Sequence, residues 1–114
     1  MRLENIRFKA KTLHDGMWIE GDLKHLTRGG VAIEGKHCIM EVDHSTVCQY
    51  TGLKDENGTD LYEGDFVRVM GQKRLIEYNS EFCAFVMKET EEYPMRELDF
   101  LSNYAFEVVG NKYD

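Results

Sequence analysis

The densest run of turn signals in the chain lies between residues 47 and 68, and it limits the fold more than any other feature. At its centre, Asn57-Gly58 supplies two residues that tolerate positive φ, as tight hairpin loops require. β-forming residues lie on both sides, so residues 47–62 predict a hairpin closed by this pair. Gly64-Asp65 gives a second turn and leads into a strand expected over residues 66–70. A chain built around this stretch is expected to be rich in β-hairpins.

Short β-forming runs, separated by turns, continue along the rest of the chain. They predict strands at residues 6–11, 17–23, 31–34, 38–42, 74–78, 82–87 and 104–111. One helical turn capped by Asp43 or Ser45 is also expected, and Pro94 could begin a short helix or 3₁₀ turn that reaches Leu101. This spacing predicts a mainly β fold, an antiparallel barrel or sandwich, and residues 61–111 could supply enough strands for a small closed barrel. The sequence shows no internal repeat.

Length and composition are those of an ordinary globular protein. The 114 residues suffice for one domain or two small lobes, and a chain of this size buries roughly 65% of its unfolded surface without disulfides or a metal. The three cysteines are odd in number and lack a CxxC spacing, so we expect a reducing compartment, the cytoplasm. No apolar run is long enough for a membrane-spanning helix, and the N-terminus lacks the apolar core of a signal peptide.

Charge is unevenly distributed, and the C-terminal half is acidic. Residues 1–59 contain eight Lys/Arg and nine Asp/Glu, whereas residues 60–114 contain six and twelve, within a net charge of −7. An acidic half repels phosphate backbones and anionic membranes. The exception is the predicted strand at residues 6–11. Its expected outward-facing cations are Arg7, Lys9 and Lys11, and its expected inward-facing residues are Ile6, Phe8 and Ala10. This cationic row is either a contact for nucleic acid or an acidic partner, or the solvated face of a strand near a sheet edge.

Trp18 is the only tryptophan. Aromatic side chains dominate both protein cores and interfaces, so two roles are open. Trp18 is either an exposed anchor for a partner or, as we favour, a half-buried side chain that covers one end of the sheet.

No group of residues in the sequence predicts catalysis or metal binding. The one metal-like group is His37, Cys38, His44 and Cys48, and its spacing matches no common zinc pattern. The acidic run at residues 88–99 could supply paired carboxylates, but on so polar a segment it is expected to be a solvated face. Motifs for a nucleophile elbow, a phosphate loop or HExxH are absent from the sequence. We therefore expect no enzyme activity, no cofactor and no metal.

Three segments resemble the YopX family, whose members are small proteins encoded by temperate phages and prophages. The most specific lies within residues 49–67 and contains QYTGLKD, NG and LYEGDFV in that order. The opening IRFKA at residues 6–10 and the closing FEVVGNKY at residues 106–113 agree as well. The resemblance implies an N-terminal β-rich lobe (residues 1–49) packed on a C-terminal SH3-like barrel (residues 50–114). It also implies a phage or prophage accessory protein in the cytoplasm of the bacterial host, with no catalytic residues.

Two kinds of function are compatible with these features. The favoured one is a non-enzymatic protein-interaction module, with a host or phage protein or further copies of itself as partner. The alternative is a small-barrel protein that binds nucleic acid through the cationic row and Arg74. Candidate partner contacts are Arg7, Lys9, Lys11, Gln49, Tyr50 and Thr51. Residues 49–51 also have a structural interpretation, which extends to Tyr62 and Asp65. In this interpretation the Tyr50 and Tyr62 side chains pack against each other across the hairpin, and Gln49 and Asp65 connect loops.

Overall fold

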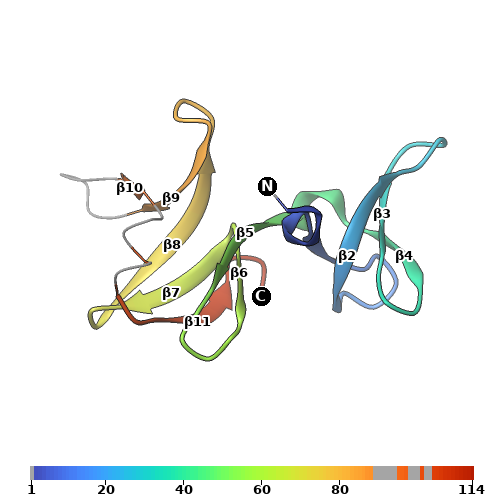
Figure 1. Cartoon of the computed structure of the whole chain (residues 1–114). Helices are drawn as coiled ribbons and strands as arrows, with labels where there is room; N and C mark the ends of the chain where they lie inside the picture. The colour runs from blue at the N-terminus through green and yellow to red at the C-terminus, as the bar shows by residue number, and fades with distance from the viewer. Residues whose placement is uncertain (1, 89–94, 98–100, 102–103) are drawn as a thin grey trace. The chain divides into compact units, whose positions relative to one another are not determined.

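The computed structural model describes residues 2–88, 95–97, 101 and 104–114, and the secondary structure of these residues is almost entirely antiparallel strand (Figure 1). In chain order the elements are η1 (Leu3–Asn5), β1 (Phe8–Lys11), β2 (Trp18–His25), β3 (Val31–Glu34), β4 (Ile39–Val42), η2 (His44–Thr46), β5 (Cys48–Lys54), β6 (Asp60–Tyr62), β7 (Asp65–Val69), β8 (Gln72–Asn79), β9 (Ala84–Lys88), β10 (Met95–Glu97) and β11 (Phe106–Asn111). The described residues contain no α-helix, which confirms the predicted mainly β, antiparallel class.

The short helix or turn predicted to begin at Pro94 is wrong over Met95–Glu97. These residues form β10, which pairs antiparallel with β9 in a register that places Met95 opposite Lys88. A free sheet edge offers backbone hydrogen bonds to a strand, and this tertiary pairing overrides a local helix signal. Pro94 and most of the acidic run at residues 88–99 lie outside the described residues.

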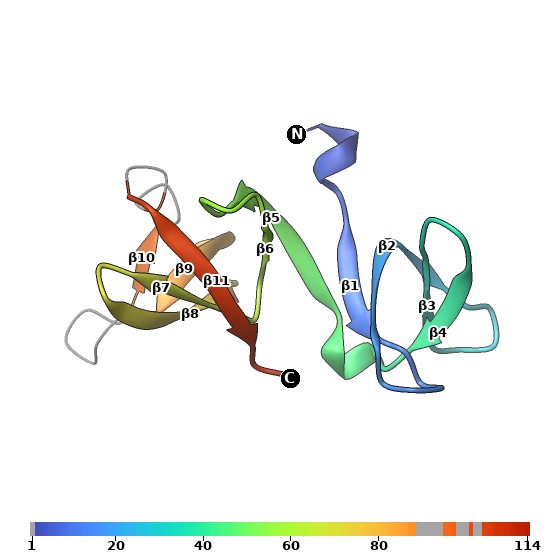
Figure 2. The ribbon, with the colours of Figure 1, turned by 90° about the horizontal axis from the view of Figure 1, so that it is seen from below.

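The chain divides into two units, residues 1–50 and residues 51–114. In the first unit the strands are ordered β5-β1-β2-β3-β4, and β6 pairs with the other edge of β5 to complete a six-stranded sheet (Figure 2). A single bridge joins Thr12, just after β1, to Val42 at the end of β4. The sheet therefore curves so that the chain just after β1 pairs with the end of β4 at one position. The two strands do not pair along their length, so the sheet is not fully closed. The predicted helical turn at Asp43 is confirmed, since the Asp43 carboxylate accepts a hydrogen bond from the Ser45 N–H.

The second strand, β2, changes partner in its middle. Trp18–Gly21 pairs with β1, and Asp22–His25 pairs with β3. At the change of partner Gly21 has φ +155°, and the Glu34 carbonyl lies where its side chain would be. Only glycine, which has no Cβ, fits so close an approach of two backbones.

The core of the first unit lies on one face of β1. Ala10, Ile33 and Val42 are its buried centre, and Phe8 and Ile19 pack against them. The inward placement predicted for Phe8 and Ala10 is thus confirmed. The prediction for Ile6 is wrong, because the strand begins only at Phe8 and the Ile6 side chain is 39% exposed.

In the second unit β7 to β11 form an open five-stranded sheet ordered β10-β9-β8-β7-β11. Its core consists of Leu61, Val67, Val69, Ile76, Met87, Leu101 and Phe106. Val67 and Val69 are buried and Arg68 is exposed, as strand alternation predicts. The described residues contain no pairing that closes this sheet into a barrel.

The two units share one strand order, which no sequence repeat revealed. In each, the last strand pairs with the first, and the first four strands follow in sequence. The first unit runs from β1 to β5, and the second from β7 to β11. The chain therefore repeats a topology rather than a sequence.

Candidate functional site

Three cations lie over two aromatic rings on the first unit. The Arg7 guanidinium carbon is 4.1 Å from the centre of the Tyr50 ring. The Lys9 and Lys11 ammonium nitrogens are 4.8 and 5.5 Å from the centre of the Trp18 ring. We call these five residues the cationic face. Cation–ring contacts of this kind stabilise by about 0.5–1 kcal/mol each at exposed sites, so they favour this arrangement of the cations over others.

Strand pairing explains why these residues meet. Lys11 is opposite Trp18 in the β1–β2 register, and the Tyr50 N–H donates to the Arg7 carbonyl at 2.8 Å. Because side chains alternate along a strand, Lys9 and Lys11 project from one side of β1, away from the Ala10 core, and Arg7 continues this row just before the strand begins. All three side chains are half-buried. Glu20 lies opposite Lys9 in the same register and contributes one negative charge.

The cationic face was only partly predictable. The outward direction of the three cations follows from the alternating pattern at residues 6–11, and Trp18 is half-buried as favoured. The contact of both lysines with Trp18 was missed. It depends on the register of β1 against β2, which a single-sequence pattern does not determine.

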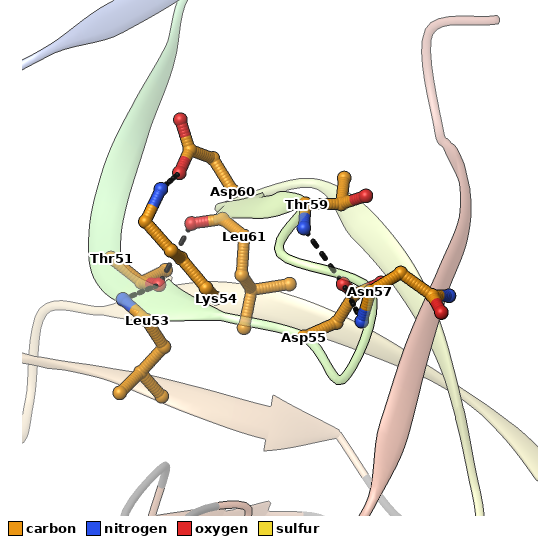
Figure 3. Close-up of polar contacts among 8 residues, drawn as sticks. All are labelled: Thr51, Leu53, Lys54, Asp55, Asn57, Thr59, Asp60 and Leu61. Atoms are coloured by element: carbon orange, nitrogen blue, oxygen red, sulfur yellow. Dashed lines mark hydrogen bonds and ion pairs between the residues drawn. The ribbon is translucent and has the colours of Figure 1, made fainter.

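The other three candidate contacts do not form one exposed surface with the cations. Tyr50 is only 3% exposed, and its ring supports Arg7. Gln49 precedes it on the strand and is half-buried. The Thr51 hydroxyl donates to the Leu61 carbonyl at 2.7 Å and accepts from the Leu53 N–H at 3.3 Å (Figure 3). Thr51 therefore joins β5 to β6.

Asp55 organises the loop between β5 and β6. It is 7% exposed, and one carboxylate oxygen accepts from the N–H groups of Asn57 (2.9 Å) and Thr59 (2.8 Å), as Figure 3 shows. The other oxygen accepts from the Val108 N–H of β11 at 2.9 Å. Nearby, the Glu56 N–H donates to the Phe106 carbonyl at 3.2 Å. The loop thus covers the outer edge of β11, where unpaired backbone groups would otherwise be open to other chains.

Burial alone would raise the pKa of Asp55, but the N–H donors of Val108, Thr59 and Asn57 outweigh it and lower the pKa below its ordinary value of 3.8. A depressed folded pKa stabilises the fold above the unfolded pKa, and this stabilisation is lost as pH falls through the folded value. We therefore expect the wild type to lose more unfolding free energy than Asp55→Asn as pH falls below 3.8. Urea denaturation of both proteins between pH 7 and pH 2 measures this. If the unfolding free energies of the two proteins fell equally over this pH range, the lowered pKa of Asp55 would be contradicted.

Asp65 forms a second hydrogen-bonded connection to β11. It is almost fully buried, and its carboxylate accepts from the Tyr62 N–H at 2.8 Å and from the Asn111 side-chain amide at 2.9 Å. These contacts agree with the structural interpretation of Asp65. The polar residues Thr51, Asp55 and Asp65 of the 49–67 segment thus hold strands together, and recognition is better sought on the cationic face.

A pocket of about 300 Å³ lies beside the same loop, with Leu53, Leu101 and Phe106 among its apolar lining. Two of its three charged side chains are already engaged, since Asp55 accepts three backbone N–H groups and Lys54 forms an ion pair with Asp60, and the third, Glu56, is exposed. Among the described residues no three His, Cys, Asp or Glu side chains gather as metal ligands. In the same part of the chain, no helix has the length and apolar character needed to cross a membrane.

The chain is thus an antiparallel β protein of two topologically alike units, with an ordered cationic face on the first. The family described as YopX protein matches residues 5–114. The chain therefore belongs to the YopX family, which confirms the resemblance found at residues 6–10, 49–67 and 106–113. A search of the curated proteins found no match.

Proposed function

We propose that this chain is a non-enzymatic protein-interaction module, encoded by a phage or prophage and acting in the cytoplasm of the bacterial host. The main support is the cationic face, where three half-buried cations lie in a row over two aromatic rings. Ordered charges steer and orient a partner of opposite charge. In the 49–67 segment, Thr51, Asp55 and Asp65 hold strands together, which leaves them less suited to recognition.

We infer further that each unit is an SH3-like small barrel. The strand order, in which the fifth strand pairs with the first and the others follow in sequence, is the order of that fold. In the first unit the 3₁₀ turn η2 precedes the last strand, and the Thr12–Val42 bridge curls the sheet as in a partly open barrel. For the second unit the support is the strand order alone. The resemblance had implied a barrel only for residues 50–114.

Nucleic-acid binding is the alternative function, and the row of Arg7, Lys9 and Lys11 favours it. Two observations weigh against it. The net charge of the chain is −7, which repels a polyanion at long range. Arg74, the fourth expected contact, lies on β8 of the second unit and donates to the Gln72 side chain. A salt-dependent shift of mixed-sequence DNA or RNA would favour the alternative.

Charge reversal tests the interaction module. The double variant Lys9→Glu/Lys11→Glu is expected to remain folded, with a free energy of unfolding lower than that of wild type by about 1–2 kcal/mol, because it loses two cation–ring contacts. Used as bait in lysogenic cells, it should lose a stoichiometric protein partner that wild type captures, because like charges now oppose the partner.

The matched control is Lys73→Glu/Lys112→Glu, which makes the same charge change at two lysines that also lie over rings, Phe66 and Tyr113. It should retain the partner. Equal capture by all three proteins, or a stoichiometric partner for none of them together with a monomeric mass by light scattering, would refute the proposal.

A further inference from the structure

We propose that the cationic face binds an extended acidic peptide segment in which carboxylates recur at every second residue. This inference rests on the proposed function and names the chemistry of the partner. It follows from the spacing of the cations, their support by aromatic rings and the charge of the first unit.

The spacing of the cations matches an extended chain. Lys9 and Lys11 project from one side of β1, and Arg7, two residues before Lys9, continues the row, since its carbonyl still pairs with the Tyr50 N–H. A strand rises about 3.3 Å per residue, so successive cations are about 6.6 Å apart. Alternate side chains of an extended peptide have the same repeat. Three carboxylates on one side of such a peptide can each meet one cation, whereas three consecutive carboxylates point to both sides.

The aromatic rings prepare the cations for this contact. Arg7 lies over Tyr50, and Lys9 and Lys11 lie over Trp18, at 4.1 to 5.5 Å from the ring centres. Long side chains ordinarily lose about 0.5–1.5 kcal/mol of conformational freedom each when a partner immobilises them. Part of that loss has already occurred here, because the rings restrict the cations before binding.

The same rings favour a peptide over nucleic acid. Proteins that bind single strands stack bases on exposed aromatic faces. Tyr50 is almost fully buried, and two lysine ammonium groups lie over the ring of the half-buried Trp18. Little aromatic surface is therefore open to a base. The cationic face therefore presents a ligand with positive charges at a regular spacing.

The local charge also suits a short acidic segment. Residues 1–50 contain seven Lys/Arg and seven Asp/Glu, so the net charge of −7 comes from residues 51–114. A peptide of about six residues spans roughly 20 Å and covers only the cationic face. Glu20, opposite Lys9, competes with the ligand for that lysine. Removing its charge should therefore strengthen binding.

Peptide titrations of the full chain test the proposal, with Trp18 fluorescence and the anisotropy of a dye on the peptide as readouts. The probes are a Glu-Ser-Glu-Ser-Glu peptide, a Glu-Glu-Glu-Ser-Ser peptide, the alternating peptide with Gln in place of Glu, and a short oligo-dT of equal charge. We expect the alternating peptide to bind at least threefold more tightly than the block peptide or oligo-dT, and the Gln peptide not to bind.

Three variants locate the contact. Lys9→Gln/Lys11→Gln should weaken binding of the alternating peptide about tenfold, the upper range for two exposed ion pairs. Glu20→Gln should tighten it about twofold, a gain that misfolding cannot produce. The control Lys73→Gln/Lys112→Gln should change it less than twofold.

Equal binding of the two acidic peptides, tighter binding of oligo-dT, or the absence of peptide binding would overturn this inference. If the peptides fail while the protein partner captured in cells still requires Lys9 and Lys11, the interaction module stands and only the peptide chemistry is wrong. If the captured partner is also indifferent to these lysines, both proposals fail.

Discussion

Replacing Asp55 with alanine is expected to lower the free energy of unfolding of the second unit by about 3 kcal/mol, the scale for hydrogen bonds to a buried charged group. The Asp55 carboxylate is the acceptor for the N–H groups of Asn57, Thr59 and Val108. Alanine leaves all three donors without this acceptor and releases the loop from the edge of β11. Urea denaturation followed by circular dichroism measures the loss, and amide hydrogen exchange at Val108 reports the contact itself.

The neighbouring residue provides the control for Asp55→Ala. Glu56 is exposed, and it contacts Phe106 through its backbone N–H, which a side-chain substitution preserves. Glu56→Ala should therefore change the unfolding free energy by no more than about 0.5 kcal/mol. If Asp55→Ala were as mild as Glu56→Ala, the loop would not depend on this carboxylate. The structural interpretation of the 49–67 segment would then be wrong.

Replacing Gly21 with alanine should destabilise the first unit by about 3 kcal/mol or more, because overpacking and backbone strain each cost 1–3 kcal/mol. A Cβ at this position would lie 1.9 Å from the Glu34 carbonyl oxygen, far inside any van der Waals contact. The neighbour is backbone and cannot rotate away. The backbone would have to move at the point where β2 changes its partner from β1 to β3. Trp18 fluorescence during urea denaturation monitors this unit.

Gly16 provides the matched comparison. It also has a positive φ, +71°, but nothing lies within 4 Å of a Cβ built there. Gly16→Ala should therefore cost only about 1 kcal/mol, from the left-handed backbone alone. Equal effects at the two glycines would mean that the close approach of β2 and β3 does not restrict Gly21.

Local patterns predicted most of the strands. The hairpins at residues 31–42 and 47–62 follow from turn residues between β-forming runs, and the burial of Val67 and Val69 follows from alternation. These features depend on a few neighbouring residues. The placement of Lys9 and Lys11 on the side of β1 opposite Ala10 was predictable for the same reason, although their side chains are half-buried.

Features that depend on distant pairing were not predictable. Asp55 and Val108 are 53 residues apart, and nothing local at Asp55 indicates a partner on β11. The common strand order of the two units is likewise a property of pairing between first and last strands. At Met95 a sheet edge overrode the helix signal of Pro94 for the same reason. Long-range hydrogen bonds decide these cases, and single-sequence patterns do not report them.

The most direct test of the account is a titration of the isotope-labelled chain with the alternating acidic peptide, followed by backbone amide chemical shifts in NMR. We predict shifts at Arg7, Lys9, Lys11 and Trp18, with residues 51–67 unchanged. The first group is the recognition surface that we propose, whereas Thr51, Asp55 and Asp65 of the second group hold strands together. Shifts confined to residues 51–67, with β1 unaffected, would contradict this division of roles.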